Sequence, residues 1–142
     1  MWNSKRIGNI GEAKTLSKFV ELQIPVCISF GDCERYDMVA EFNGKLNKIQ
    51  CKTCLNMKDE DSFEIYIINR STKEGKDISR SYSKEDVDYF SIYNVEKDIL
   101  LLYPNNEYQS TAITFRINPS KNNQVKGINF VKDYLFENIV KK

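Results

Sequence analysis

The sequence predicts a mixed α/β fold, a central mixed β-sheet flanked by helices. Three observations support this prediction. A helix-like apolar pattern opens the chain, a short β-hairpin follows it, and further strand-like segments precede a second helix-like pattern. The 142 residues suit a single domain covering 1–142, and the sequence shows no internal repeat, linker or low-complexity block.

The first helix is predicted to extend to about Ile24, where Pro25 ends it. It begins near Gly8 or earlier, after Asn3 or Ser4. Apolar residues at three- and four-residue steps form the predicted buried stripe: Ile10, Ala13, Leu16, Val20 and Ile24. We expect this helix to pack on the hairpin that follows.

Glu12 lies near the start of this helix, beside the predicted stripe. The neighbouring Gly8 and Gly11 would allow another backbone to approach closely. Taken alone, Glu12 is most simply a solvated acid that interacts with the helix dipole.

Residues 36–53 are predicted to form two short strands joined at Asn43-Gly44. Asn-Gly between alternating apolar residues is a strong hairpin signal, because a type I′ turn needs positive φ at both central positions. If these two residues form the loop, Phe42 pairs with Lys45. The turn therefore sets the register of the whole hairpin.

The hairpin places polar side chains on one face. In the two-residue register Asp37 lies opposite Gln50, with Lys52 one pair further on, and a four-residue loop would set Asp37 opposite Lys52 instead. Cys51 points to the other face in both registers. An acid, an amide and an ammonium group are thus expected within a few ångströms of one another.

Further strands are predicted at residues 26–30, 63–68, 88–95, 99–103 and 111–117. The polar segment 69–83 is predicted to be a solvated or partly disordered loop, or alternatively a loop that follows phosphates. A final helix is predicted over residues 129–140. Its expected inward residues are Phe130, Val131, Tyr134, Leu135 and, as a further candidate, Ile139.

Composition excludes several classes of function. The net charge is +1, from 21 basic and 20 acidic residues, so a nucleic-acid surface would require local segregation of charge. The chain has no histidine, which removes histidine-activated nucleophiles and histidine metal ligands. No apolar run approaches the roughly 18 residues that span a membrane, and no signal-peptide pattern is present, so we expect a cytoplasmic protein without membrane contact.

The four cysteines are Cys27, Cys33, Cys51 and Cys54. They are expected to be thiols in a cytosolic protein. A zinc or redox site using Cys51 and Cys54 is an alternative, but residues three apart in a strand point to opposite faces. We therefore expect no zinc.

The hairpin face has the donors that a hard cation prefers, since Mg²⁺ takes oxygen ligands. Asp37 offers a carboxylate, Gln50 an amide oxygen and Cys51 its backbone carbonyl, and Glu12 joins them if the first helix packs over the hairpin. Lys52 would then face the reacting group. The set suits phosphodiester hydrolysis, although the spacing alone leaves open a solvated or salt-bridged face.

Several motifs in order resemble those of the PD-(D/E)xK superfamily of nucleases, specifically the group I intron homing endonuclease-type family with the Gln-x-Lys variant. The upstream motifs are Gly8–Glu12, Phe30-Gly31-Asp32 followed by Arg35-Tyr36-Asp37, and Ile49–Thr53. The downstream motifs are Glu85–Phe90, Thr114–Ile117 and Phe130–Tyr134. The resemblance covers nearly the whole chain.

This resemblance implies a restriction endonuclease-like core and Mg²⁺-dependent cleavage of double-stranded DNA, with Mn²⁺ as a substitute. Asp37 would be the essential metal ligand, Glu12 would support metal and water, and Lys52 would be the catalytic lysine. Gln50 stands where the family usually has Asp or Glu, so the site has one fewer negative charge. Family members of this size act as homo-oligomers, which implies a dimer or tetramer.

DNA contacts are expected from basic residues: Arg35, Arg70, Lys73, Lys76, Arg80, Arg116, Lys121 and Lys126. The Asn- and Gln-rich loop 119–124 could pair with adenine edges. Two alternatives to a site-specific endonuclease stay open. One is a structure-selective nuclease that resolves DNA junctions, and the other is a non-catalytic DNA-binding module that retains the fold.

Overall fold

The computed structural model describes residues 3–31, 33–67, 69–80, 82–106 and 111–141, and within these it does not describe the side chains of 69–73 and 77–80. Its main sheet has five strands, in spatial order β1 (Val26–Ile28), β2 (Met38–Phe42), β3 (Lys45–Cys54), β7 (Tyr89–Asn94) and β8 (Ile99–Pro104). The β3–β7 pair is parallel and the other pairs are antiparallel. The predicted mixed central sheet is confirmed.

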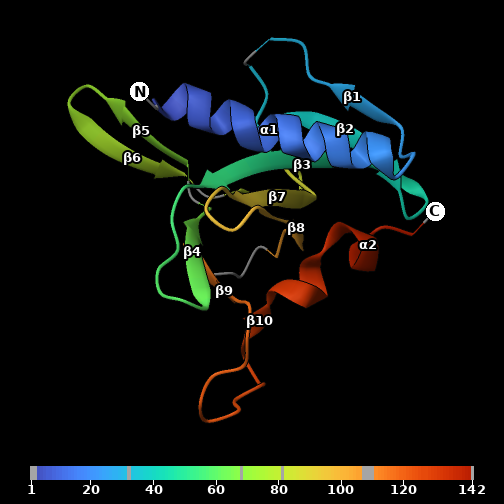
Figure 1. The fold of residues 1–142 in the computed structure, drawn as a ribbon. Coiled ribbons are helices and arrows are strands. Elements are labelled where there is room, and N and C mark those ends of the chain that lie inside the picture. Colours follow the sequence, from blue (N-terminus) through green and yellow to red (C-terminus); the bar gives the residue numbers. More distant parts are fainter. Residues whose placement is uncertain (1–2, 32, 68, 81, 107–110, 142) are drawn as a thin grey trace.

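Helix α1 (Ser4–Glu21) lies across one face of this sheet (Figure 1). Asn3 caps it, since its side-chain oxygen accepts a hydrogen bond from the Arg6 N–H at 2.9 Å. The other face of the sheet packs against a second sheet of three strands, in the order β10 (Asn129–Phe130), β9 (Ala112–Arg116) and β4 (Ser62–Tyr66). The main sheet is thus covered on both faces.

The predicted buried stripe of α1 is confirmed only in part: Ile24, which follows α1, is 5% exposed, and Leu16 packs against the core between α1 and the sheet. The residues that α1 buries are Gly11, Thr15 and Phe19, whereas Ala13 is exposed and Val20 is 62% exposed. The helix approaches the sheet so closely that a Cβ on Gly11 would lie 2.1 Å from Thr53 Oγ1. Gly11 and Thr15 therefore lie where the helix meets the sheet most closely, and an apolar pattern could not reveal them. The predicted close approach holds at Gly11, while nothing lies within 4 Å of a Cβ built on Gly8.

The β2–β3 hairpin has the predicted two-residue loop. Asn43 and Gly44 have φ of 55° and 79°, and Phe42 pairs with Lys45. Met38 pairs with Ile49, and the Asp37 N–H donates to the carbonyl of the same Ile49, so the ladder does not continue in register to the predicted pairing of Asp37 with Gln50. The strand itself starts at Met38 rather than Tyr36.

The predicted polar loop over residues 69–83 is wrong for most of its length, because β5 (Asn69–Lys73) and β6 (Lys76–Arg80) form a separate antiparallel hairpin. Glu74 and Gly75, with φ of 53° and 74°, form its turn. The strands are too polar to show the period-two apolar alternation by which a strand is recognised. In Figure 1 the hairpin projects on the side of the molecule where β3 ends.

The predicted final helix over 129–140 is also wrong. The segment is divided into β10, a 3₁₀ turn (Val131–Tyr134) and the short α2 (Phe136–Ile139). Leu135 is extended, with φ of −62° and ψ of 144°, and forms a bridge to Leu101 of β8. Pairing with the two sheets replaces the helical hydrogen bonds that the apolar spacing predicted.

No helix in the described part of the chain combines the length and the apolar character needed to cross a membrane.

Candidate active site

Asp37 lies one residue before β2, where the chain leaves the sheet. Its N–H donates at 2.8 Å to the carbonyl of Ile49, the residue that also pairs with Met38, so two successive residues face one residue of β3 as in a β-bulge. Its Oδ2 accepts a hydrogen bond from the Cys51 N–H at 2.8 Å. The Asp37 carboxylate thus accepts the hydrogen bond of the Cys51 N–H of β3, beyond the point where β2 begins.

The backbone of β3 also directs a carbonyl toward this place. The N–H and C=O of one strand residue point to the same side, and the sides alternate along the strand. The Ile49 carbonyl faces β2, and the Lys48 carbonyl faces β7 because it accepts the Asp88 N–H at 2.9 Å. The Cys51 carbonyl therefore points to the side on which the Asp37 carboxylate lies.

Gln50 and Lys52 share the face of β3 opposite to α1. In the parallel ladder Gln50 pairs with Phe90 and Lys52 pairs with Ile92, both of which belong to the core under the second sheet. The Lys52 ammonium donates to the hydroxyl of Tyr82 at 3.2 Å and lies 4.9 Å from the centre of the Tyr82 ring. Tyr82 was missed from the sequence, because it lies in the segment predicted to be a loop.

Glu12 comes to the site from α1, and its carboxylate is one of the groups that affect the Cys51 thiol. Burial raises the pKa of this thiol, and the carboxylates of Asp37 and Glu12 raise it further, whereas a hydrogen bond with Thr15 opposes the rise. Glu12 and Met38, the residue after Asp37, line the same shallow pocket, so α1 brings Glu12 to the hairpin near Asp37.

Cys51 and Cys54 point in opposite directions, as their spacing predicts. Cys51 packs with the core between α1 and the sheet, and Cys54 packs with the core under the second sheet. The Cys54 thiol donates to the Asn56 carbonyl at 3.1 Å. One metal ion could not be bound by both thiols.

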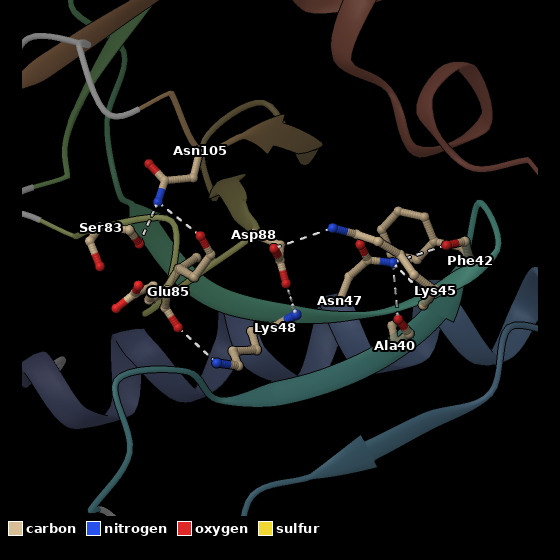
Figure 2. A network of polar contacts seen from close by, with 10 residues as sticks. Ala40, Phe42, Lys45, Asn47, Lys48, Ser83, Glu85, Asp88 and Asn105 are labelled. Atoms are coloured by element: carbon tan, nitrogen blue, oxygen red, sulfur yellow. Dashed lines mark hydrogen bonds and ion pairs between the residues drawn. The ribbon is translucent and has the colours of Figure 1, made fainter.

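A turn over residues 82–88 borders the site and is held by side chains (Figure 2). The Asn105 amide donates to the carbonyls of Ser83 at 3.0 Å and Val87 at 2.8 Å. The Asp86 Oδ2 accepts from the Ser83 N–H at 3.0 Å and from Arg35 at 2.7 Å. These bonds, the Ser83 N–H first and the Arg35 charge after it, hold the pKa of the Asp86 carboxyl below its ordinary value despite partial burial.

The same turn contacts β3 at Lys48. The Lys48 ammonium donates to the Glu85 carbonyl at 2.7 Å, and the Lys48 N–H donates to Asp88 at 2.9 Å (Figure 2). Tyr82 meets Lys52 further along the strand. One turn therefore contacts the site face of β3 on both sides of Gln50.

The predicted DNA-contacting residues belong to several elements of the fold, from the segment before β2 to the segment after β9. Arg35 is bound to Asp86 and lies over the Tyr82 ring, 4.0 Å from its centre. Arg116 is half-buried in β9, and its Nε donates to the Asn118 carbonyl at 3.3 Å. Exposed side chains belong to Lys76, Lys121 and Lys126. The side chains that the structure does not describe are those of Arg70, Lys73 and Arg80.

Within the described residues, no three histidine, cysteine, aspartate or glutamate side chains gather closely enough to hold a metal ion. The predicted donor set is of a different kind, with two carboxylates, one amide and one backbone carbonyl. All four are oxygen donors, which suits Mg²⁺ or Mn²⁺.

The sequence profile of PD-(D/E)XK endonucleases matches residues 2–137. The chain belongs to this family. No curated protein matches the chain. Among solved structures, that of a bacterial homing endonuclease, I-Ssp6803I, is similar with a TM-score of 0.75 and 18% identity, over 94% of this chain and 88% of that chain. At this identity the likeness shows the fold, and the family profile shows that the protein is a nuclease.

Proposed function

We propose that the protein is a divalent-metal-dependent endonuclease that hydrolyses phosphodiester bonds of double-stranded DNA at specific sites, with residues 1–142 as one nuclease domain. The observation that carries the proposal is the Asp37 carboxylate at 2.8 Å from the Cys51 N–H, beside the strand that carries Gln50 and Lys52. The family membership and the likeness to a homing endonuclease support it.

Asp37, Glu12, Gln50 and the Cys51 carbonyl would hold Mg²⁺, with Mn²⁺ as a substitute. When bound, the ion would offset charge on the phosphate and make water a better nucleophile. Because Gln50 is neutral, Glu12 supplies the second negative charge of this set. The Cys51 N–H orients the Asp37 carboxylate, so that its position does not depend on the ion.

Lys52 is proposed as the catalytic lysine. Its ammonium group lies on the same face as Gln50, in position to hold an attacking water or to donate to a phosphate oxygen as negative charge develops. Such donors act most strongly where water is partly excluded, and the Lys52 side chain is half-buried.

Cleavage is tested by selecting cut duplexes from a randomised DNA library with Mg²⁺ or Mn²⁺. We expect wild type to cut and Lys52→Ala to cut about 10²- to 10³-fold more slowly with DNA affinity retained, since the lysine acts in the transition state. The matched control is Lys45→Ala, because Lys45 is an exposed lysine at the start of the same strand. Wild-type protein that leaves linear, supercoiled and library DNA intact with both metals would contradict the proposal.

The same assay separates the alternative substrates. Faster cutting of a four-way junction than of linear duplex would point to a junction-resolving nuclease, and tight binding without cutting would point to a DNA-binding module. Light scattering of the purified protein tests the proposed dimer or tetramer, because a single active site must act twice to cut both strands.

A further inference from the structure

Tyr82 is the described residue whose hydroxyl group meets the Lys52 ammonium. The distance from Lys52 Nζ to the Tyr82 oxygen is 3.2 Å, and that to the ring centre is 4.9 Å. A hydroxyl oxygen and the face of an aromatic ring both attract an ammonium group. Lysine has a long flexible side chain, so such contacts decide where its charge lies.

Tyr82 is itself held firmly. The residue is only 7% exposed, and its ring meets Phe90 edge-on, with 5.3 Å between centres and 81° between planes. Phe90 is the ladder partner of Gln50. The hydroxyl is therefore placed by packing against the strand beside the proposed site.

The segments around the Tyr82–Lys52 contact are also bonded to one another beside the proposed site. Arg35, two residues before Asp37, lies 4.0 Å from the Tyr82 ring centre and binds Asp86 of the 82–88 turn. The turn thus contacts the segment that leads to Asp37 as well as the strand that carries Lys52. A displacement of Tyr82 would disturb both the segment that leads to Asp37 and the contact with Lys52.

We infer that Tyr82 is a positioning residue, which places the Lys52 ammonium for the reaction through its hydroxyl and ring. This role rests on the proposed nuclease function. Tyr82 is not assigned a contact with DNA or metal. Its effect is to reduce the conformational freedom of Lys52 before the substrate binds.

The test compares Tyr82→Phe with Tyr93→Phe, both in the full chain. Tyr93 is a close match, since it is 4% exposed, its hydroxyl binds Asp98, and Lys14 lies 5.5 Å from its ring centre on the α1 side. On a duplex recovered from the library selection, with Mg²⁺, we expect Tyr82→Phe to lower kcat about tenfold with KM unchanged, as for loss of a hydrogen bond to a charged group. Tyr93→Phe should leave kcat unchanged, and both variants should unfold at similar temperatures.

A second measurement does not depend on activity. Reductive methylation of the lysines, followed residue by residue by mass spectrometry, should modify Lys52 several-fold faster in Tyr82→Phe than in wild type, with Lys14 as the internal reference. Unchanged Lys52 reactivity, or a kcat that stays the same or rises, would overturn the inference. If wild type cuts no DNA, the proposed function fails, and the methylation rates alone decide whether Tyr82 holds Lys52.

Discussion

Gly11 shows how one residue determines where α1 lies. A side chain at this position would overlap Thr53, whose Oγ1 is buried without a hydrogen-bond partner among the described residues. The absence of a Cβ lets the helix approach β3, and this approach brings Glu12 to the hairpin.

We predict that Gly11→Ala destabilises the protein by about 1–3 kcal/mol, as overpacking of a core does. Gly8→Ala in the same helix is the control and should be stabilising by up to about 1 kcal/mol, because nothing lies near its Cβ and alanine favours helix. Urea unfolding measures both. Thr53→Ala should restore part of the loss in Gly11→Ala, and an equal effect of the two glycine substitutions would refute the packing argument.

Cys51 is predicted to resist alkylation in the folded protein. Its pKa is raised by burial and by Asp37 and Glu12, so little thiolate forms near neutral pH, whereas Cys27 and Cys33 are exposed. With iodoacetamide at pH 8, mass spectrometry should find Cys27 and Cys33 modified and Cys51 protected until urea unfolds the chain. Modification of Cys51 as fast as Cys27 would show that the carboxylates and α1 do not enclose it.

At the scale of elements, the 82–88 turn connects the segment that leads to Asp37 with the strand β3, which carries Lys52. Asn105 binds its carbonyls, Lys48 binds the Glu85 carbonyl, and Arg35 binds Asp86. Most of these contacts join residues more than twenty positions apart in the sequence. The turn is therefore held by tertiary structure rather than by its own propensity.

We predict an acid-sensitive contribution from Asp86. Its folded-state pKa is lowered from 3.8, so the stabilisation is present above the ordinary carboxyl pKa and is lost as pH falls through the lowered value. Asp86→Asn should cost about 1–2 kcal/mol near neutral pH, and its difference from wild type should shrink as the pH falls below that ordinary value. Thermal unfolding at several pH values measures this.

The control for this prediction is a double-mutant cycle with Arg35→Ala. The double variant should lose less than the sum of the two single variants near neutral pH, because the two side chains share one ion pair. A difference between Asp86→Asn and wild type that is the same at every pH would rule out a carboxylate-dependent role.

For the whole molecule, the proposed metal site predicts a link between Mg²⁺ and stability. An ion that binds only the folded state raises the free energy of unfolding, by about 2.7 kcal/mol at 100 times its Kd. We expect Mg²⁺ to raise the Tm of wild type and to leave that of Asp37→Ala nearly unchanged. Glu41→Ala, which removes an exposed acid from β2, the strand that follows Asp37, should respond as wild type does, and an equal response of Asp37→Ala would exclude Asp37 as a ligand.

The sequence by itself determined the hairpin and the face that Gln50 and Lys52 share. Both follow from local rules, because Asn43-Gly44 sets the register and side chains alternate along a strand. The mixed sheet was predicted in the same way, from short segments of strand-like alternation.

Only the tertiary structure decided which residues join the site. Glu12 reaches the hairpin because Gly11 allows close helix packing, and Tyr82 reaches Lys52 because Asn105 and Asp86 hold a turn whose start the sequence predicts only as part of a polar loop. The final segment is not the predicted helix, because pairing with β8 and β9 outweighs its helical spacing. These outcomes depend on contacts between distant parts of the chain, which local periodicity in the sequence does not encode.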